Sequence, residues 1–343
     1  MTKHPINRID VREPVTVQNL TLFPLYLSQT GGPEYISSSE ALEDHGMVVK
    51  EVSDDGAVPN LLVENPSSHC VLLLDGEELR GAKQNRIVNT TLLLAARSRT
   101  VIPVSCTESG RWSYDSPTFS HSKTVMPAKA RRKKTRSVSA SLASMANYTS
   151  DQGEVWNEVD ELHAKVGSYS ATSAMSDAYE QMRADLESAI GKIPVQEGQF
   201  GLLAMINNKP VGLDLISRKQ VYQVLHSQLV KSYAMEAIAA RRDPQASSAP
   251  GKTDKPDPDQ NALLAAKAFL ERCAAIKGDP FDSVALGTDW RFVSDSIVGS
   301  GLEVDDAWVH MAYFVDEAES HRQSSRLPGT IARPSRRSRF RRE

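Results

Sequence analysis

The sequence is poor in cysteine and has no long apolar run. Its 343 residues include three cysteines, Cys70, Cys106 and Cys273, which lie far apart in the chain. An odd number of distant cysteines excludes a disulfide framework and indicates a reducing compartment. No apolar stretch approaches the about 18 residues of a membrane-spanning helix, and the first residues, MTKHPINRIDVREP, lack the apolar core of a signal peptide. We therefore expect a cytoplasmic protein with no membrane association.

The common catalytic and metal-binding signatures are also missing. The chain has no C-x-x-C and no H-E-x-x-H pair, so no segment has the spacing of a zinc site and we expect no metal. The nucleophile-elbow pattern G-x-S-x-G does not occur. The one Gly-Lys-Thr sequence, residues 251–253, lies in a Pro-rich segment with no strand before it, which argues against a phosphate-binding loop. The sequence therefore names no cofactor.

What the sequence does contain is the composition of an ordinary globular protein, with 40% hydrophobic and 24% charged residues. Residues 15–112 are strand-rich, residues 126–241 have mainly helical periodicity, and residues 261–317 hold a helix followed by strand-like patches. This order predicts an α+β fold with an N-terminal antiparallel β-sandwich or partly open barrel, a helical middle and returning C-terminal strands. We expect one composite domain over residues 1–319, and a two-domain division near Met126 is the alternative.

Hydrophobic periodicity and turn residues predict the individual elements. Three strands, residues 70–74, 86–96 and 100–106, should be neighbours in one antiparallel sheet, with a tight turn at residues 97–99. A hairpin should turn around Asn207 and Asn208. The predicted helices cover residues 38–44, 155–166, 175–190, 217–240 and 261–276.

Two segments have the composition of disordered chain. Pro, Ser, Gly and Asp dominate residues 243–259, which predicts a linker or surface loop, and residues 320–343 form a basic tail. Neither can bury enough apolar area to offset an ordering entropy of roughly 1–2 kcal/mol per residue. We expect a nonspecific protease to cut both segments while the rest of the chain survives as one unit.

Basic residues are concentrated, although the formal net charge is only -3. Six of the eight residues from Lys129 to Arg136 are basic, and six arginines lie between Arg333 and Arg342. Both runs could neutralise the phosphates of a nucleic acid. The alternative is a solvated helix face for the first run and a disordered tail for the second. No aromatic residue is interleaved with the first run for base stacking, which favours the alternative.

Residues 72–112, LLLDGEELRGAKQNRIVNTTLLLAARSRTVIPVSCTESGRW, are the most motif-like part of the chain. Glu78 follows a predicted strand at a glycine turn, where it suits proton transfer, metal binding or simple solvation. Gln84 and Arg86 share one face of a strand, because side chains alternate with period two. An amide beside a guanidinium suits a carboxylate, phosphate or nucleotide ligand, and a salt bridge between Arg86 and Glu108 is the alternative.

Three further residues have two interpretations each. Cys106 is a candidate nucleophile beside a cation, or a small buried hydrophobe. Trp112 is suited to stacking on a ring of a ligand, or to covering the core. His310 lies in the apolar run WVHMAYF and suits a core histidine, or an acid–base residue if it faces Glu78.

The predicted hairpin brings the polar residues of this block together. Arg86 begins one strand and Glu108 follows its partner, and directly opposed side chains of an antiparallel pair lie about 5 Å apart. We therefore predict that Gln84, Arg86, Glu108 and Arg111 line one concave surface, with Glu78 at its rim.

These motifs resemble a known family. GEELRGAKQNR, IPVSCTESGRW, and Gln152 and Trp156 in QGEVW resemble the uncharacterised prokaryotic family named for its association with ADP-ribosylglycohydrolase and rhodanese-phosphatase domains. GLLAMINNKPVGLDL, LVKSYAMEA and AWVHMAYF extend the resemblance over Val15 to Val315. Gene neighbourhoods of the family imply ADP-ribose or NAD metabolism, or prokaryotic stress and phage-defence systems, and no settled activity.

Three functions compete on this basis. The first is binding or processing of an ADP-ribose, NAD-related or other nucleotide ligand. In it, Gln84, Arg86, Arg111 and Trp112 bind the ligand, and the candidate catalytic residues are Glu78, Glu108 and Cys106. The second is a non-enzymatic interaction module with protein partners in a defence or ADP-ribosylation system, in which the motif is a structural network. The third is a nucleic-acid binder that uses the two basic runs.

Overall fold

The N-terminal part of the chain builds a small closed barrel. The computed structural model describes residues 5–28, 31–53, 59–243 and 258–316. Apolar side chains such as Val49, Leu61 and Leu79 fill the barrel. Its antiparallel strands follow one another around the wall in the order β11 (Ser98–Cys106), β6 (Asn60–Asn65), β5 (Val48–Glu51), β12 (Phe119–Val125), β8 (Glu77–Gly81) and β9 (Arg86–Val88).

The predicted continuous strand over residues 86–96 is wrong, because the chain leaves the barrel after Val88. Its first part is β9, which pairs with β11, and its last part is β10 (Leu92–Leu94), which pairs with β7 (Cys70–Leu73) in a separate sheet. Between them Thr90 donates to Asp289 at 2.6 Å and Thr91 bonds to His310 at 2.8 Å. These contacts turn the chain toward distant strands. The three predicted strands therefore do not share one sheet.

The separate sheet has three strands and carries the first α-helix. β4 (Tyr35–Ser37) runs parallel to β7, and β7 runs antiparallel to β10. The helix α1 (Ser38–Asp44) follows β4 directly, as predicted. Ser37 and Glu40 form a capping box in which each side chain accepts from the backbone N–H of the other residue.

A nine-stranded antiparallel sheet forms the other half of the fold. The predicted hairpin around Asn207 is its centre, and the predicted C-terminal strands complete one side. Its order is β1 (Ile9–Val11), β3 (Leu20–Leu27), β13 (Gly201–Ile206), β14 (Lys209–Ile216), β18 (Ala307–Val315), β17 (Ile297–Val304), β16 (Thr288–Val293) and β15 (Gly278–Asp282), with β2 (Val15–Val17) paired to β3; the short η1 (Pro5–Arg8) precedes β1.

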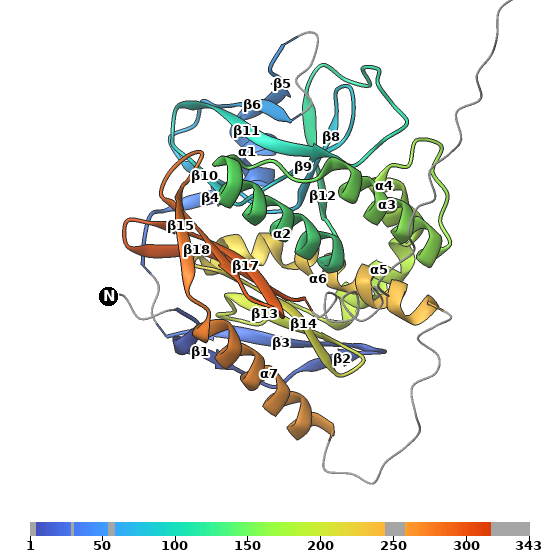
Figure 1. Cartoon of the computed structure of the whole chain (residues 1–343), viewed down its shortest axis with the longest axis vertical. Helices are drawn as coiled ribbons and strands as arrows, with labels where there is room; N and C mark the ends of the chain where they lie inside the picture. Colours follow the sequence, from blue (N-terminus) through green and yellow to red (C-terminus); the bar gives the residue numbers. More distant parts are fainter. Residues whose placement is uncertain (1–4, 29–30, 54–58, 244–257, 317–343) are drawn as a thin grey trace, which may run out of the picture.

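Alternating side chains of this sheet bury against a helix on each face. Leu202 and Ala204 pack in the same core as α6 (Lys219–Arg242), whereas Leu203 and Met205 pack with α7 (Pro258–Ala275). Figure 1 shows α7 outside the sheet, and α6 together with α2 (Ala128–Met145) between the sheet and the barrel.

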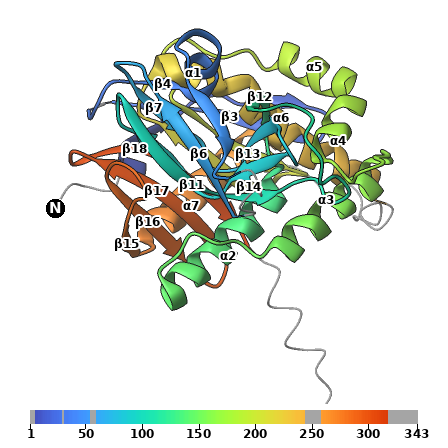
Figure 2. The ribbon, with the colours of Figure 1, turned by 90° about the horizontal axis from the view of Figure 1, so that it is seen from above.

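Three shorter helices cover one side of the barrel: α3 (Gln152–Val166), α4 (Met175–Gln181) and α5 (Arg183–Lys192). Figure 2 shows them on the side of the barrel opposite to β15–β18. The predicted single helix over residues 175–190 is divided at Met182, which lies outside the helical region at φ -93° and ψ 9°. The two halves have different partners, since α4 packs against α3 and α5 against α6.

The α+β class is confirmed, and the predicted barrel is closed rather than partly open. The composite domain over residues 1–319 stays a prediction. The predicted linker and tail lie outside the described residues, with two exceptions. Asp243 is the residue that follows α6, and residues 258–259 begin α7.

Candidate functional site

The turn Asp75-Gly76-Glu77-Glu78 sends its side chains to different parts of the molecule. The carboxylate of Asp75 accepts hydrogen bonds from Lys134 and Thr135 of α2. Gly76 adopts a φ of +78°, and a Cβ there would lie 2.9 Å from Cγ of Arg131. The turn therefore contacts α2 too closely for any residue larger than glycine.

Glu77 has a structural environment of its own. Its carboxylate accepts from the backbone N–H of Leu74 at 2.9 Å and from the hydroxyl of Ser38. The Nε2 atom of His121 lies 2.7 Å from Oε1, the same oxygen that accepts from Ser38. Glu77 thus joins β8 to α1 and β12. Glu78, the next residue of the turn, has a different role.

Glu78 is a buried carboxyl group next to a cavity. It accepts from the hydroxyl of Thr107 at 3.0 Å and from that of Thr124 at 3.1 Å. Burial raises its pKa to about 7, against the opposing effects of the threonine hydrogen bonds and Arg80. Glu78 is therefore a carboxyl group that can both hold and release a proton near neutral pH.

A hydrogen-bonded chain leads from Glu78 toward solvent. Thr124 bonds to Glu78, and its hydroxyl lies 2.6 Å from the hydroxyl of Ser122, which is partly exposed. All three side chains line one cavity of about 270 Å³. The hydroxyl groups of Thr124 and Ser122 give the buried carboxyl a route for proton exchange with the cavity, although Glu78 itself has no exposed surface.

The cavity is rich in cationic side chains, which come from β8, β12, α5 and α6. Lys123 pairs with Glu43 at 2.7 Å. Lys231 is half-buried, and burial lowers its pKa. Neither Lys231 nor Arg80 forms an ion pair within the described part of the chain. The full lining is Glu78, Arg80, Ser122, Lys123, Thr124, Ser176, Tyr179, Glu180, Arg183, Leu186, Glu187 and Lys231.

Arg86 lies on the opposite face of the barrel wall from Glu78. The register pairs Glu78 with Ile87 and Leu79 with Arg86, and paired residues share a face. Arg86 therefore points into the barrel with Leu79, and Glu78 points out of it. The predicted single concave surface with Glu78 at its rim is wrong.

Inside the barrel, Arg86 contacts three of its predicted neighbours. Its Nη1 atom donates to Gln84 at 2.9 Å and to the sulfur of Cys106 at 2.6 Å. Its guanidinium carbon lies 5.8 Å from the centre of the Trp112 ring. The carboxylate nearest to it belongs to Glu51, at 3.7 Å, so the alternative salt bridge with Glu108 is wrong.

Glu108 and Arg111 pair with each other instead. Glu108 accepts from Arg111 at 2.7 Å, from Thr172 at 2.8 Å and from the backbone N–H of Asn85 at 3.2 Å. Burial opposes ionisation of Glu108, but these hydrogen bonds outweigh burial and lower its pKa. Both residues connect the end of the barrel to the segment between α3 and α4, and a catalytic role for Glu108 stays a prediction.

Cys106 is held in its thiol form. It has no exposed surface, and burial raises its pKa despite the nearby guanidinium of Arg86. Its backbone N–H donates to Gln152 at 2.8 Å, and the Gln152 amide donates back to its carbonyl at 2.8 Å. Through these two hydrogen bonds, Gln152 fixes the start of α3 to β11. A nucleophilic role for Cys106 stays a prediction.

A second group of buried charges was missed by the sequence reasoning. Arg131 donates to Asp214 on β14, and Tyr233 donates to the same carboxylate at 2.8 Å. His310 bonds to Thr91 and lies 3.3 Å from Asp214, so it belongs to this group and does not face Glu78. Burial would raise the pKa of Asp214, but Arg131 holds it well below its usual range. The sequence feature that could have indicated this group is Asp214, the lone acid in the apolar run PVGLDLI.

The basic run of α2 is occupied by internal partners. Arg131 and Lys134 have no exposed side-chain surface. This excludes a solvated face for the run and leaves little of it for phosphate. The ion pairs are Lys129–Glu158, Lys129–Glu161, Arg131–Asp214, Arg132–Asp316, Lys133–Glu154, Lys133–Glu158, Lys134–Asp75 and Arg136–Asp316.

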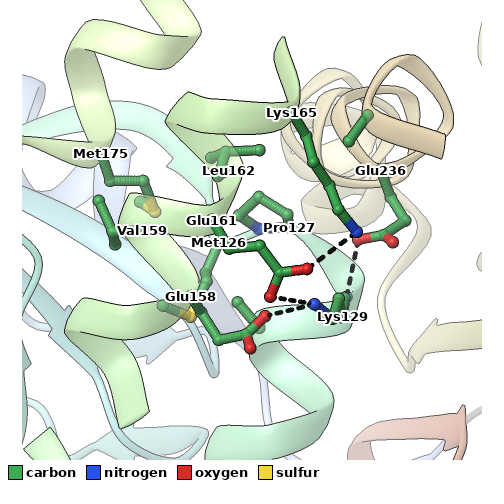
Figure 3. A pocket seen from close by; sticks show the side chains of 12 residues that line it. Met126, Pro127, Lys129, Glu158, Val159, Glu161, Leu162, Lys165, Met175 and Glu236 are labelled. Atoms are coloured by element: carbon green, nitrogen blue, oxygen red, sulfur yellow. Dashed lines mark hydrogen bonds and ion pairs between the residues drawn. The ribbon is translucent and has the colours of Figure 1, made fainter. Parts of the chain in front are cut away.

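A second pocket lies among α2, α3 and α6 and is too small for an organic ligand. Figure 3 shows Lys129 and Lys165 directed toward Glu161 across it, and these pairs measure 2.6 and 2.9 Å. The open volume is about 20 Å³, enough for one water molecule. The cavity beside Glu78 is therefore the better candidate site.

The described residues hold no group of three or more His, Cys, Asp or Glu side chains placed to bind a metal ion. In the same part of the chain, no helix combines the length and the apolar character needed to cross a membrane.

Comparison with known proteins gives one match. The family model described as ARG and Rhodanese-Phosphatase-superfamily-associated Protein domain matches residues 8–314. No curated protein and no solved structure matches the chain.

Proposed function

Because the chain belongs to the ARG and Rhodanese-Phosphatase-superfamily-associated Protein domain family, we propose that its Glu78 cavity binds the sugar-phosphate part of an ADP-ribose-type nucleotide. Glu78 exchanges a proton with the bound ligand through Thr124 and Ser122. The observation that carries the proposal is a buried carboxyl with a pKa of about 7 at a cavity lined by four cationic side chains.

The charge of the cavity favours an anionic ligand. Arg80 and Lys231 form no ion pair within the described residues, and burial disfavours the charged form of Lys231. Glu187 acts on Lys231 electrostatically, but neither Glu180 nor Glu187 forms an ion pair with Arg80 or Lys231 among the described residues. A phosphate group would add a counter-charge and accept hydrogen bonds from both cationic side chains. Lys123 and Arg183 already have acidic partners, Glu43 and Glu180, and therefore contribute less to binding.

The size of the cavity suits a part of a nucleotide. Its volume of about 270 Å³ is slightly below the roughly 300–1,000 Å³ of typical small-molecule pockets. It therefore fits a ribose phosphate, with the rest of a larger ligand outside. The family description supports this choice of ligand, since it records an association with ARG proteins.

The chemistry of Glu78 suits general acid–base catalysis. A group is most effective in this role when its pKa lies near the working pH. Thr124 and Ser122 extend its reach to the cavity by hydrogen bonds of 3.1 and 2.6 Å. The reaction class is a hydrolysis, in which Glu78 donates a proton to the leaving oxygen of the sugar or phosphate, or removes one from the water molecule that displaces it.

Calorimetric titration with ADP-ribose, NAD, AMP and inorganic phosphate tests the binding step. We expect ADP-ribose to bind and Lys231→Gln to weaken binding at least tenfold. Lys192→Gln, an exposed lysine of α5 outside the cavity lining, is the matched control and should bind as the parent protein does. If none of the four compounds binds, or if the two lysine variants behave alike, the proposal fails.

The proton-transfer step needs a separate measurement. If product formation from a bound ligand is detected, Glu78→Gln and Thr124→Val should both abolish it while leaving ligand affinity within about threefold. If Thr124→Val keeps full turnover, the hydroxyl groups of Thr124 and Ser122 take no part in the proton transfer.

A non-enzymatic interaction module is the second candidate, and one observation favours it. Much of the motif is satisfied internally, since Glu108 pairs with Arg111 and Asp75 with Lys134. Such a network holds the barrel, α2 and α3 in fixed positions, as a scaffold requires. Ligand binding that depends on Lys231 would separate the two candidates in favour of the first.

A further inference from the structure

One end of the barrel interior contains a buried ion pair whose hydrogen bonds are incomplete. Glu51 and Arg86 face each other there, with side-chain exposures of 4% and 0%. Both carboxylate oxygens of Glu51, and the Nε and Nη2 atoms of Arg86, have no hydrogen-bond partner in the described part of the chain. Their closest approach is 3.7 Å, beyond hydrogen-bond distance.

Such an arrangement is costly unless something completes it. Buried charged groups in proteins almost always have hydrogen-bond partners, and those that lack one cost several kcal/mol. The group that satisfies both residues must donate to the carboxylate and accept from the guanidinium at the same time. Gln84 and Cys106 already accept from Nη1 of Arg86, so the open positions are its Nε and Nη2 atoms.

Exposed aromatic rings lie over this end of the barrel. Trp112 lies 5.8 Å from the Arg86 guanidinium and 5.6 Å from the Lys83 ammonium, and 51% of its surface is exposed. Tyr114 is 52% exposed and also lies beside Lys83, at 5.1 Å. Both rings belong to residues 107–118, which form neither helix nor strand, so they lie outside the strands of the barrel wall. A ligand that reaches the ion pair from this side requires the Trp112 side chain to rotate.

We propose that this end of the barrel is a second binding site, which takes a guanine base. Guanine presents two adjacent N–H donors beside one carbonyl acceptor on its pairing edge. The two donors match the two oxygens of Glu51, and the carbonyl accepts from Nη2 of Arg86. The rotated indole of Trp112 stacks on the base, an interaction that every aromatic base permits.

The base specificity follows from the two acceptors of Glu51. Adenine offers one amino group and no carbonyl on the corresponding edge, so one oxygen of Glu51 and the guanidinium would stay unsatisfied. Hypoxanthine, the base of inosine, keeps the carbonyl and one N–H but lacks the 2-amino group. It therefore isolates a single hydrogen bond to Glu51.

This site is independent of the Glu78 cavity, because Arg86 and Glu78 lie on opposite faces of β8 and β9. The nucleosides guanosine, inosine and adenosine are the probes, since they carry no phosphate that could bind in the other cavity. Equilibrium dialysis gives their affinities for the whole chain. A change in Trp fluorescence reports the site where it is lost in Trp112→Ala, since the chain has three further tryptophans.

We expect guanosine to bind roughly tenfold or more tightly than inosine or adenosine, as the loss of a hydrogen bond to a charged group predicts. Glu51→Gln should remove the preference for guanosine over inosine, and Trp112→Ala should weaken guanosine at least tenfold. Trp112 is half-exposed, so we expect its replacement to keep the fold, and Lys192→Gln, at an exposed position of α5, should leave guanosine binding unchanged.

The proposal would be overturned by equal affinities for the three nucleosides, by no guanosine binding at millimolar concentration, or by unchanged binding in Trp112→Ala. Water molecules would then complete the ion pair. A final comparison of GMP with a single-stranded guanine-containing oligonucleotide distinguishes a free nucleotide from a nucleic acid as the source of the base. Failure of ADP-ribose to bind would affect the Glu78 cavity alone and would leave the guanine site standing.

Discussion

The guanidinium of Arg131 donates two hydrogen bonds, of 3.0 and 2.6 Å, to the carboxylate of Asp214, and neither side chain is exposed. Arg131 lies on α2, beside the turn at Gly76, and Asp214 lies at the centre of the nine-stranded sheet. The pair therefore connects the barrel side of the molecule to the sheet through a single helix.

Removing one partner of this pair should be strongly destabilising. Asp214→Asn leaves the Arg131 charge buried without a counter-ion, and we expect a loss of about 3–5 kcal/mol in the free energy of unfolding. Urea denaturation measures it. Arg99→Ala, which removes an arginine that is 70% exposed and paired with Glu64, is the control and should cost less than about 1 kcal/mol. Equal losses in the two variants would contradict a special role for the buried pair.

Gly76 should tolerate no side chain. A Cβ at this position would lie 2.9 Å from Cγ of Arg131, which is fixed by Asp214, and the φ of +78° disfavours any L residue. We expect Gly76→Ala to destabilise the protein by about 2–4 kcal/mol. Gly191→Ala, on α5, is the matched control, because a Cβ at that position would meet no atom within 4 Å. Thermal denaturation should show it unchanged or slightly more stable.

The stability of the protein should fall as the pH rises through the range set by Glu78. Burial raises the pKa of Glu78 from 4.5 to about 7, so between these values the folded state retains a proton that the unfolded state has released. Its contribution is therefore complete below pH 4.5 and is lost as the pH approaches 7, by on the order of 3 kcal/mol.

Glu78→Gln should remove this pH dependence and make the variant more stable than the parent at pH 8. Urea denaturation at several pH values between 4.5 and 8 provides the measurement. Glu187→Gln, an exposed acid of the same cavity, should keep the parent's slope. If the slope persists in Glu78→Gln, another group is responsible for it.

The sequence allowed the class, the family and several elements to be predicted, because these depend on local patterns. The helix over Ser38–Asp44, the hairpin at Asn207 and the helical spacing of residues 155–166 each follow from residues close together in the chain. The contact of Arg86 with Cys106 was also predictable, since the two residues lie opposite each other on paired strands.

The arrangement of the site was not predictable in the same way, because it depends on which face of each strand is turned to which neighbour. Glu78 and Arg86 were expected on one surface, but the register of β8 and β9 places them on opposite faces. Lys231 lies in the segment LVKSYAMEA of the family resemblance but was not named as a site residue, and it joins the cavity because α6 packs against β12. Period-two reasoning fixes the faces of one strand but gives no information on the register between two strands.

Cysteine reactivity should distinguish a buried hydrophobe from a nucleophile at Cys106. Burial raises the thiol pKa of Cys106 and of Cys273, whereas Cys70 is partly exposed. With an aromatic disulfide reagent at pH 8, we expect the native protein to react rapidly at Cys70 and slowly at the other two residues, because the thiolate is the reacting form. Cys70→Ser should remove the rapid phase, and denaturant should expose the remaining two thiols. A rapid phase that survives in Cys70→Ser and disappears in Cys106→Ser would instead identify Cys106 as an activated thiolate, and would bring it back into the catalytic mechanism beside Arg86.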